Sequence, residues 1–126
     1  MTNRVLIGDL DPLVARGLIA TLIEEHFDVL DASTTDHLDD LADAVVRHHP
    51  DAVIVRMVPE PEATVRALRA LQPGLRVVEC DDDRPLLRVH PIGGVPYTLE
   101  PVTASTLRRA LSTSAPAPDS RPADVR

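Results

Sequence analysis

The chain has 126 residues, enough for one compact domain, and carries a formal net charge of −7. This charge argues against a nucleic-acid surface, because phosphate binding requires clustered positive charge. All 13 basic residues are arginine, so a lysine-dependent site is excluded. The single Cys80 excludes an internal disulfide, and no apolar run approaches the length of a membrane span. We therefore expect a cytoplasmic domain that itself contacts neither a membrane nor nucleic acid.

Up to Cys80, apolar strand-like runs alternate with amphipathic helical segments. Asp11 and Pro12 supply an N-cap and a first-turn proline for the first helix. The apolar stripe predicted for this helix contains Leu13, Val14, Leu18, Leu22 and Ile23. The expected elements in chain order are a strand at 4–8, a helix from Pro12, a strand at 27–30, a helix carrying Leu38, Leu41, Val45 and Val46, a strand at 52–55, a helix at 62–71 and a strand at 75–78.

After Cys80 the pattern weakens, because Pro85, Pro91 and Pro96 leave little room for a regular helix. The sequence predicts at most a short or distorted fourth helix around residues 86–89. A short strand follows at 97–99, and Thr103 caps a last helix that continues to Leu111. We predict a domain over residues 1–113 and a disordered Pro/Ala/Asp-rich linker or tail over residues 114–126.

This order of elements predicts an α/β fold. Right-handed crossovers between parallel strands place helices on both faces of a sheet. The count of five strands favours a flavodoxin-like three-layer αβα sandwich with parallel strand order 2-1-3-4-5. In such sheets, ligands and chemistry gather outside the carboxyl ends of the strands.

Three segments of the sequence form a recognisable pattern, namely Arg4–Leu18, Pro50–Val55 and Tyr97–Val102. In this order and spacing they resemble receiver domains of two-component response regulators, nearest the branch whose output domain is a helix-turn-helix. The resemblance covers about residues 3–111. It implies an acidic pair for Mg²⁺ after the first strand and a phosphoacceptor Asp after the third. It also implies a hydroxyl after the fourth strand and a Lys before a cis-proline after the fifth.

The chain departs from this pattern at most of the implied positions. Asp9 matches the first acid, but Leu10 replaces the second, and Arg56 stands at the phosphoacceptor position. The hydroxyl position falls on Cys80 or Asp81. Glu100 replaces the lysine, with Pro101 following as the resemblance implies. A guanidinium cannot accept a phosphoryl group, and we expect no bound metal and no cofactor.

The charges at two of these positions are exchanged, since a base replaces an acid at Arg56 and an acid replaces a base at Glu100. We expect Arg56 to form an ion-pair network with Asp9 and Glu100, because arginine pairs well with carboxylates. The alternative is that Arg56 points to solvent beside a degraded site. On the premise that the network is partly buried, removing one partner would cost about 3–5 kcal/mol.

The function expected from the resemblance is that of a phosphorylation-independent receiver domain of an orphan regulator, which acts in signal transduction and transcription regulation. It would dimerise or bind a partner regulatory protein. The expected interface residues are Tyr97, Val102, Leu107 and Leu111. The alternative is a pseudo-receiver that binds a small metabolite at the vestigial acidic site. We do not expect an enzyme, because no Gly-rich phosphate cradle and no nucleophile–base pair stands out.

Overall fold

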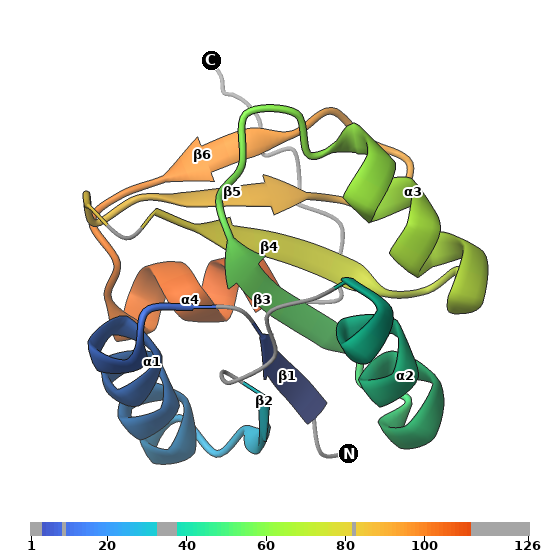
Figure 1. Ribbon diagram of the computed structural model, residues 1–126. Helices are drawn as coiled ribbons and strands as arrows, with labels where there is room; N and C mark the ends of the chain where they lie inside the picture. The colour runs from blue at the N-terminus through green and yellow to red at the C-terminus, as the bar shows by residue number, and fades with distance from the viewer. Residues whose placement is uncertain (1–3, 9, 33–37, 82, 112–126) are drawn as a thin grey trace.

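Within the described part of the chain, six strands form one mixed sheet with helices on both faces (Figure 1). The computed structural model describes residues 4–8, 10–32, 38–81 and 83–111. The strand order is β2-β1-β3-β4-β5-β6. The elements are β1 (Arg4–Gly8), α1 (Pro12–Glu24), β2 (Asp28–Ala32), α2 (Leu38–His48), β3 (Ala52–Arg56), α3 (Glu62–Leu71), β4 (Arg76–Cys80), β5 (Leu87–His90), β6 (Tyr97–Leu99) and α4 (Ala104–Leu111).

The first four strands follow the predicted arrangement. β1 pairs in parallel with both β2 and β3, and β3 pairs in parallel with β4. The continuous apolar runs of β1 and β3 are buried, as expected for strands that are covered on both faces. This confirms the α/β class and the 2-1-3-4 part of the predicted strand order.

The all-parallel, five-stranded sheet and the fourth helix were wrong. Residues 87–90 form β5, which pairs antiparallel with β4, and β6 pairs antiparallel with β5. Leu87 and Val89 are fully buried, and the two polar residues between and after them reach the opposite face. This alternation is the two-residue period of a strand. Only five residues separate Pro85 from Pro91, too few for a helix of ordinary length.

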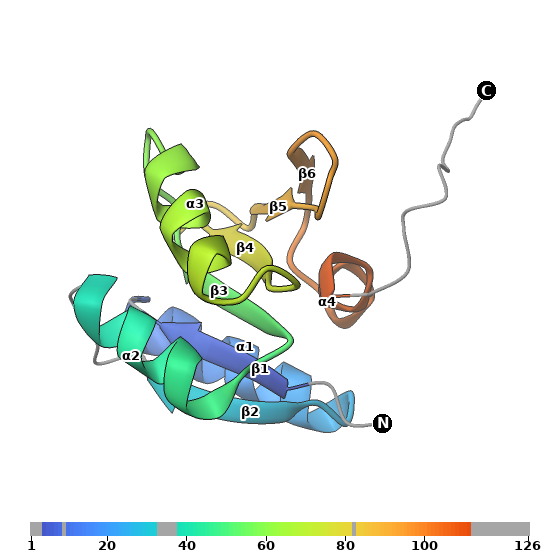
Figure 2. The same ribbon diagram turned by 90° about the vertical axis from the view of Figure 1, so that its right-hand side faces the viewer.

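Two helices cover each face of the sheet, so the fold has three layers (Figures 1 and 2). α1 and α4 lie over one face, and the ion pair between Glu25 Oε1 and Arg108 Nε, 2.8 Å long, joins them. α2 and α3 lie over the other. Each face has its own aliphatic core. The core below α1 and α4 includes Val5, Ile7, Leu22, Ile54, Val78 and Leu107, and the core below α2 and α3 includes Leu6, Val45, Val53, Leu68 and Val77.

Both predicted helix caps are present. The Asp11 side chain accepts a hydrogen bond from the Leu13 backbone N–H at 2.9 Å. The Thr103 hydroxyl accepts one from the Thr106 backbone N–H at 3.2 Å. These bonds satisfy backbone donors that the first turn of a helix leaves unpaired.

The predicted core stripe of α1 is partly wrong. Leu13 is 75% exposed and Ile23 is 58% exposed. Ala15, Leu18 and Leu22 are the residues that α1 buries. On α2, Val46 is likewise exposed. Leu18 and Leu22 of the predicted stripe are thus confirmed as core residues, and Val14 packs against the same core, whereas Leu13 and Ile23 at its two ends do not.

The predicted linker or tail at residues 114–126 lies outside the described residues, as does Asp9. None of the helices in the described ranges combines the length and hydropathy needed to cross a bilayer.

Candidate functional site

The carboxyl ends of β1, β3 and β4 lie at one edge of the sheet, because these strands are parallel. β6 has the same direction as β4, since each is antiparallel to β5. The structure therefore brings Leu10, Arg56, Cys80, Asp81 and Glu100 to this edge. Asp9 also belongs to the predicted site but lies outside the described residues.

Leu10 belongs to the hydrophobic core and not to a polar site. Its side chain is only 2% exposed and lies in the cluster below α1 and α4. A carboxylate at this position would be taken out of water, which is costly unless it is paired. Residue 10, where the resemblance implies the second Mg²⁺-binding acid, is therefore a packing position in this domain.

Arg56 and Cys80 face each other as register partners at the ends of β3 and β4. The Met57 backbone N–H extends this pairing by donating to the Cys80 carbonyl at 3.0 Å. Arg56 is exposed, whereas Cys80 is buried. Because a thiol inside an apolar cluster behaves as a small hydrophobic group, Cys80 is a packing residue in this site.

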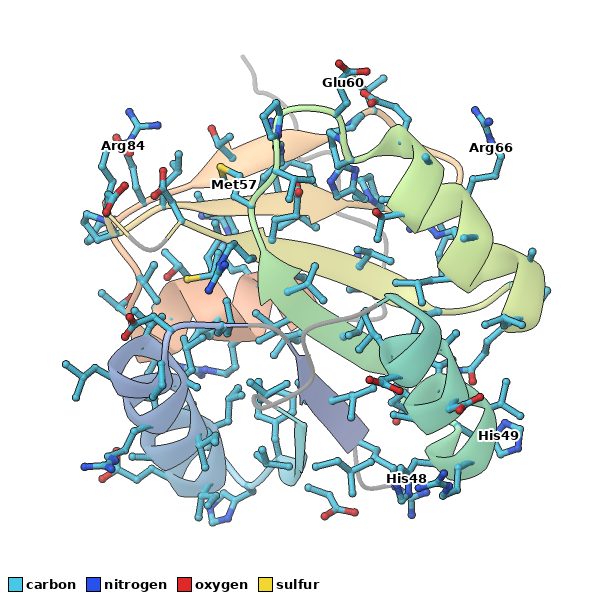
Figure 3. All side chains as sticks on the ribbon, in the orientation of Figure 1. His48, His49, Met57, Glu60, Arg66 and Arg84 are labelled. Carbon is cyan, nitrogen blue, oxygen red and sulfur yellow. The ribbon has the colours of Figure 1, made fainter. Side chains whose placement is uncertain are left out.

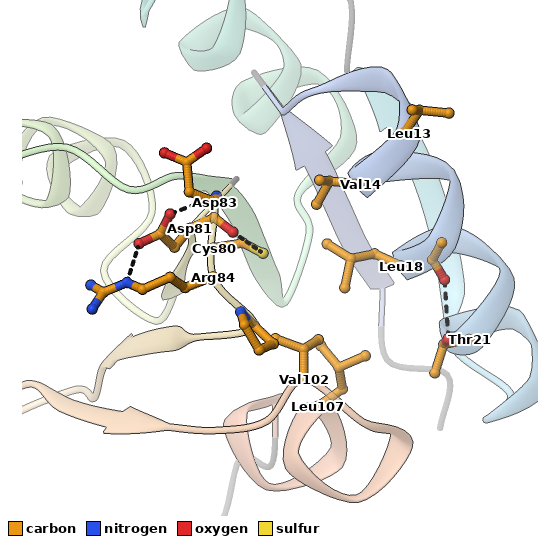
Figure 4. A pocket seen from close by; sticks show the side chains of 12 residues that line it. Leu13, Val14, Leu18, Thr21, Cys80, Asp81, Asp83, Arg84, Val102 and Leu107 are labelled. Carbon is orange, nitrogen blue, oxygen red and sulfur yellow. Dashed lines mark hydrogen bonds and ion pairs between the residues drawn. The ribbon is translucent and has the colours of Figure 1, made fainter.

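Asp81 is held by its own loop between β4 and β5. Its carboxylate accepts hydrogen bonds from the Asp83 backbone N–H at 2.8 Å and from Arg84 Nε at 3.3 Å (Figure 4). The Asp83 N–H, with help from Arg84, holds the pKa of Asp81 below its ordinary value, although partial desolvation opposes this. Asp81 therefore stays ionised, with its oxygens directed at neighbouring donors of the same loop.

Glu100 follows β6 and is exposed. The insertion of β5 places three strand spacings between β3 and β6, where the predicted order had two. At about 4.8 Å per spacing, the separation grows from roughly 10 Å to roughly 14 Å. This weakens the geometric basis for pairing Arg56 with Glu100, and the pairing stays a prediction. The Glu100–Pro101 peptide bond is cis, as the resemblance implied for Pro101.

The four predicted interface residues all contribute to the core below α1 and α4. Leu107 and Leu111 are buried there, while Tyr97 and Val102 are partly buried against it. Their side chains are therefore engaged within the chain. A contact between these residues and a second copy stays a prediction.

Sequence reasoning missed a buried polar network around Glu79, whose side chain is 1% exposed. Glu79 Oε1 accepts from Arg88 Nε at 2.6 Å and lies 2.9 Å from His90 Nε2. Glu79 Oε2 accepts from the Val58 backbone N–H at 3.2 Å, and the Arg88 guanidinium donates to the Val58 carbonyl at 2.9 Å. The Glu79–Arg88 pair thus holds both backbone polar groups of Val58, two residues after Arg56.

α3 is tied to this network through Arg69. Arg69 Nε donates to the Leu75 carbonyl at 3.1 Å, and another nitrogen of the guanidinium donates to the His90 carbonyl. Burial, together with the positive charge of Arg76, lowers the pKa of Arg69 from its ordinary value. One sequence signal pointed to the network, because Glu79 directly follows the apolar residues Val77 and Val78 in β4 and a buried carboxylate requires partners.

The described residues contain no group of three or more His, Cys, Asp or Glu side chains that could hold a metal ion. Because Asp9 lies outside them, this finding does not test the predicted absence of a metal. His48 and His49 lie at the carboxyl end of α2, far from the site edge, where they point outward (Figure 3).

A cleft of about 420 Å³ opens beside the site between α1, the loop from β4 to β5, and the start of α4 (Figure 4). We call it the α1 cleft. Its walls are partly apolar and partly polar, and Asp81, Asp83 and Arg84 line its charged side. Cys80 and Asp81 connect it with the predicted site. The apolar lining residues include Leu13, Val14, Leu18, Val102 and Leu107.

No protein-family model matches this sequence, and no curated protein is similar to it at a significant level.

Proposed function

We propose that this domain is a receiver-like regulatory module that works without phosphorylation. It acts in signal transduction and transcription regulation by dimerisation or by binding a regulatory protein. Phosphorylation of a receiver needs a carboxylate nucleophile at the end of the third strand. β3 ends instead in Arg56, and this is the observation on which the proposal rests. The β2-β1-β3-β4 order also supports it.

The residues around Arg56 agree with a loss of phosphoryl chemistry. The position of the second Mg²⁺-binding acid is Leu10, which is buried in the core, and Mg²⁺ prefers oxygen ligands. The position of the lysine is Glu100, which would repel a phosphoryl group. In this proposal the domain is cytoplasmic, has no catalytic residue and no cofactor, and does not itself contact nucleic acid.

Incubation with a small-molecule phosphodonor and Mg²⁺, followed by intact-protein mass spectrometry, tests the proposal. We expect no phosphorylated product from this chain under conditions that label a phosphorylatable receiver in the same tube. Arg56→Ala should also stay unlabelled, since neither side chain is an acceptor. A phosphorylated product from the wild-type chain would overturn the proposal.

The α1 cleft favours a second candidate function, the sensing of a small ligand. Its volume of about 420 Å³ lies within the range of small-molecule sites, and it combines apolar walls with a few polar groups. A metabolite library screened by thermal shift would identify a ligand by a rise in Tm. Val14→Arg, which changes a cleft wall, should abolish that rise. Ile23→Arg, at an exposed position of the same helix that does not line the cleft, should preserve it.

A further inference from the structure

The loop between β5 and β6 presents an apolar surface to solvent. Its sequence from Pro91 to Pro96 contains no charged residue. Ile92 is 53% exposed and Val95 is 82% exposed. We call these two residues of the loop its apolar tip. Large aliphatic side chains that are exposed on one short loop mark an interaction surface more often than isolated ones do.

A groove of about 540 Å³ lies next to this tip, between the loop and α3. We call it the α3 groove. Val65 and Ala70 of α3 and Pro91 and Pro96 of the loop supply apolar walls, and His90 of the Glu79 network also lines the groove. The groove exists because β5 takes the place of the predicted helix, so that no described helix other than α3 borders this part of the sheet (Figure 2).

The exposed side of α3 is mostly apolar. Glu62 and Arg66 are its two exposed charged residues, beside the half-buried Arg69, and Figure 3 shows Arg66 projecting away from the helix into solvent. Neither takes part in the ion pairs found within the described ranges. The remaining exposed residues of this side are Ala63, Ala67, Ala70 and Leu71, and the three alanines would allow another helix to approach closely.

We propose that the α3 groove and the β5–β6 loop form a two-fold interface between two copies of this chain. A two-fold interface needs a self-complementary patch. This surface has an exposed apolar tip beside a groove, and in the proposed dimer the tip of each copy packs in the groove of the other. With α3 antiparallel to its symmetry mate, Glu62 of one copy faces Arg66 of the other, and the contact occurs twice.

Charge also favours a second copy as the occupant. Two chains of net charge −7 repel each other over most of their surface, but the α3 groove is lined by one acid, Glu62, and two bases, Arg66 and Arg69, so it carries no net negative charge. The inference supplies the partner for the regulatory module proposed above, and on that function it rests. It places the interface away from Leu107 and Leu111, whose side chains are already buried in the core.

Sedimentation equilibrium of the full chain over a range of concentrations tests the interface. We expect a monomer–dimer equilibrium that Val95→Asp or Ala67→Glu weakens by at least about tenfold. Each of the single variants Glu62→Arg and Arg66→Glu creates two contacts between like charges, one on each side of the two-fold axis. Either variant should therefore weaken the dimer by about tenfold. The double variant restores reciprocal pairs and should recover most of the affinity.

Val46→Asp is the matched control, since Val46 is an exposed valine on α2, outside the groove and the loop. It should leave the dimer unchanged, and melting curves should show that all variants are folded. A chain that stays monomeric, or a dimer that Val46→Asp disrupts and Val95→Asp does not, would overturn the inference. Either result leaves the phosphodonor experiment unaffected, so failure of the interface and failure of the proposed function can be told apart.

Discussion

Glu79 and Arg88 form an ion pair of 2.6 Å across β4 and β5, the pair of strands at which the sheet changes from parallel to antiparallel. The same two side chains bind the N–H and the C=O of Val58. They therefore fix the antiparallel strand and the chain that leaves β3 in one arrangement. A buried carboxylate with this many donors favours the observed pairing over a helix at residues 87–90, which would leave Glu79 without Arg88 and His90.

Glu79→Ala should strongly destabilise the domain. It leaves the Arg88 guanidinium, which is 27% exposed, and the Val58 N–H without their acceptor. Breaking a buried pair from one side costs about 3–5 kcal/mol. Urea unfolding of the variant and the wild type measures this loss.

Asp28→Ala provides the control for Glu79→Ala. It breaks the 3.5 Å pair between Arg4 and Asp28, in which both side chains are nearly half exposed. Such surface pairs contribute about 0–1 kcal/mol. If the two variants lost similar stability, the Glu79 network would not hold the fold together.

The sequence predicted the parallel half of the sheet because its apolar runs and helix caps are local signals. Asp11 and Thr103 cap the helices that they were expected to cap. The segment 86–89 could not be assigned in this way, since four residues with three apolar positions suit either a short helix or a strand. The strand at this segment depends on a contact outside it, because Arg88 binds Glu79, which lies nine residues earlier in the chain.

The candidate site was predictable only in part. The end of β3 placed Arg56 at the sheet edge, and Cys80 and Asp81 follow from the same rule for β4. The burial of Leu10 could not be foreseen from its position in the loop after β1. The extra strand also could not be foreseen, and it changes the expected distance between Arg56 and Glu100. The distances between the predicted site residues therefore depend on the strand order, which the sequence predicted only in part.

The pKa of Asp81 should lie below its ordinary value of about 3.9, and carboxyl NMR titration measures it. The main cause is the Asp83 backbone N–H, so Asp83→Pro, which lacks that donor, should raise the pKa more than Arg84→Ala does. Asp83→Ala keeps the N–H and serves as the control. A larger rise with Arg84→Ala than with Asp83→Pro would contradict this order of causes.

The lowered pKa of Asp81 also has a consequence for stability in acid. A carboxyl group whose pKa is lower in the folded state than in the unfolded state stabilises the fold above the unfolded value. That contribution is lost as pH falls through the folded value. Asp81→Asn removes it, so the stability of the variant should fall less steeply below about pH 4. If the free energy of unfolding fell equally steeply with pH in the wild type and in Asp81→Asn, Asp81 would not contribute to this loss of stability in acid.

Arg56→Ala and Glu100→Ala should each destabilise the domain by about 0–1 kcal/mol. This is less than the 3–5 kcal/mol expected for a partly buried network, because both residues are exposed. If Arg56 pairs with Glu100, the double variant should cost less than the sum of the single variants. Additive costs in thermal unfolding would show that the two side chains do not interact.

Gly8→Ala and Gly17→Ala should change stability in opposite directions. A Cβ at Gly8, the last residue of β1, would lie 2.7 Å from Leu41 Cδ1. Leu41 is a residue of α2, and its side chain is buried in the core between this helix and the sheet. Overpacking a core typically costs about 1–3 kcal/mol, and the flexible end of Leu41 places the expected cost near the lower limit. Gly17 lies inside α1 with no atom within 4 Å of an added Cβ. Alanine there should stabilise the helix by about 0.5–1 kcal/mol. Urea unfolding measures both changes, and a stabilising Gly8→Ala would show that α2 does not pack against the end of β1.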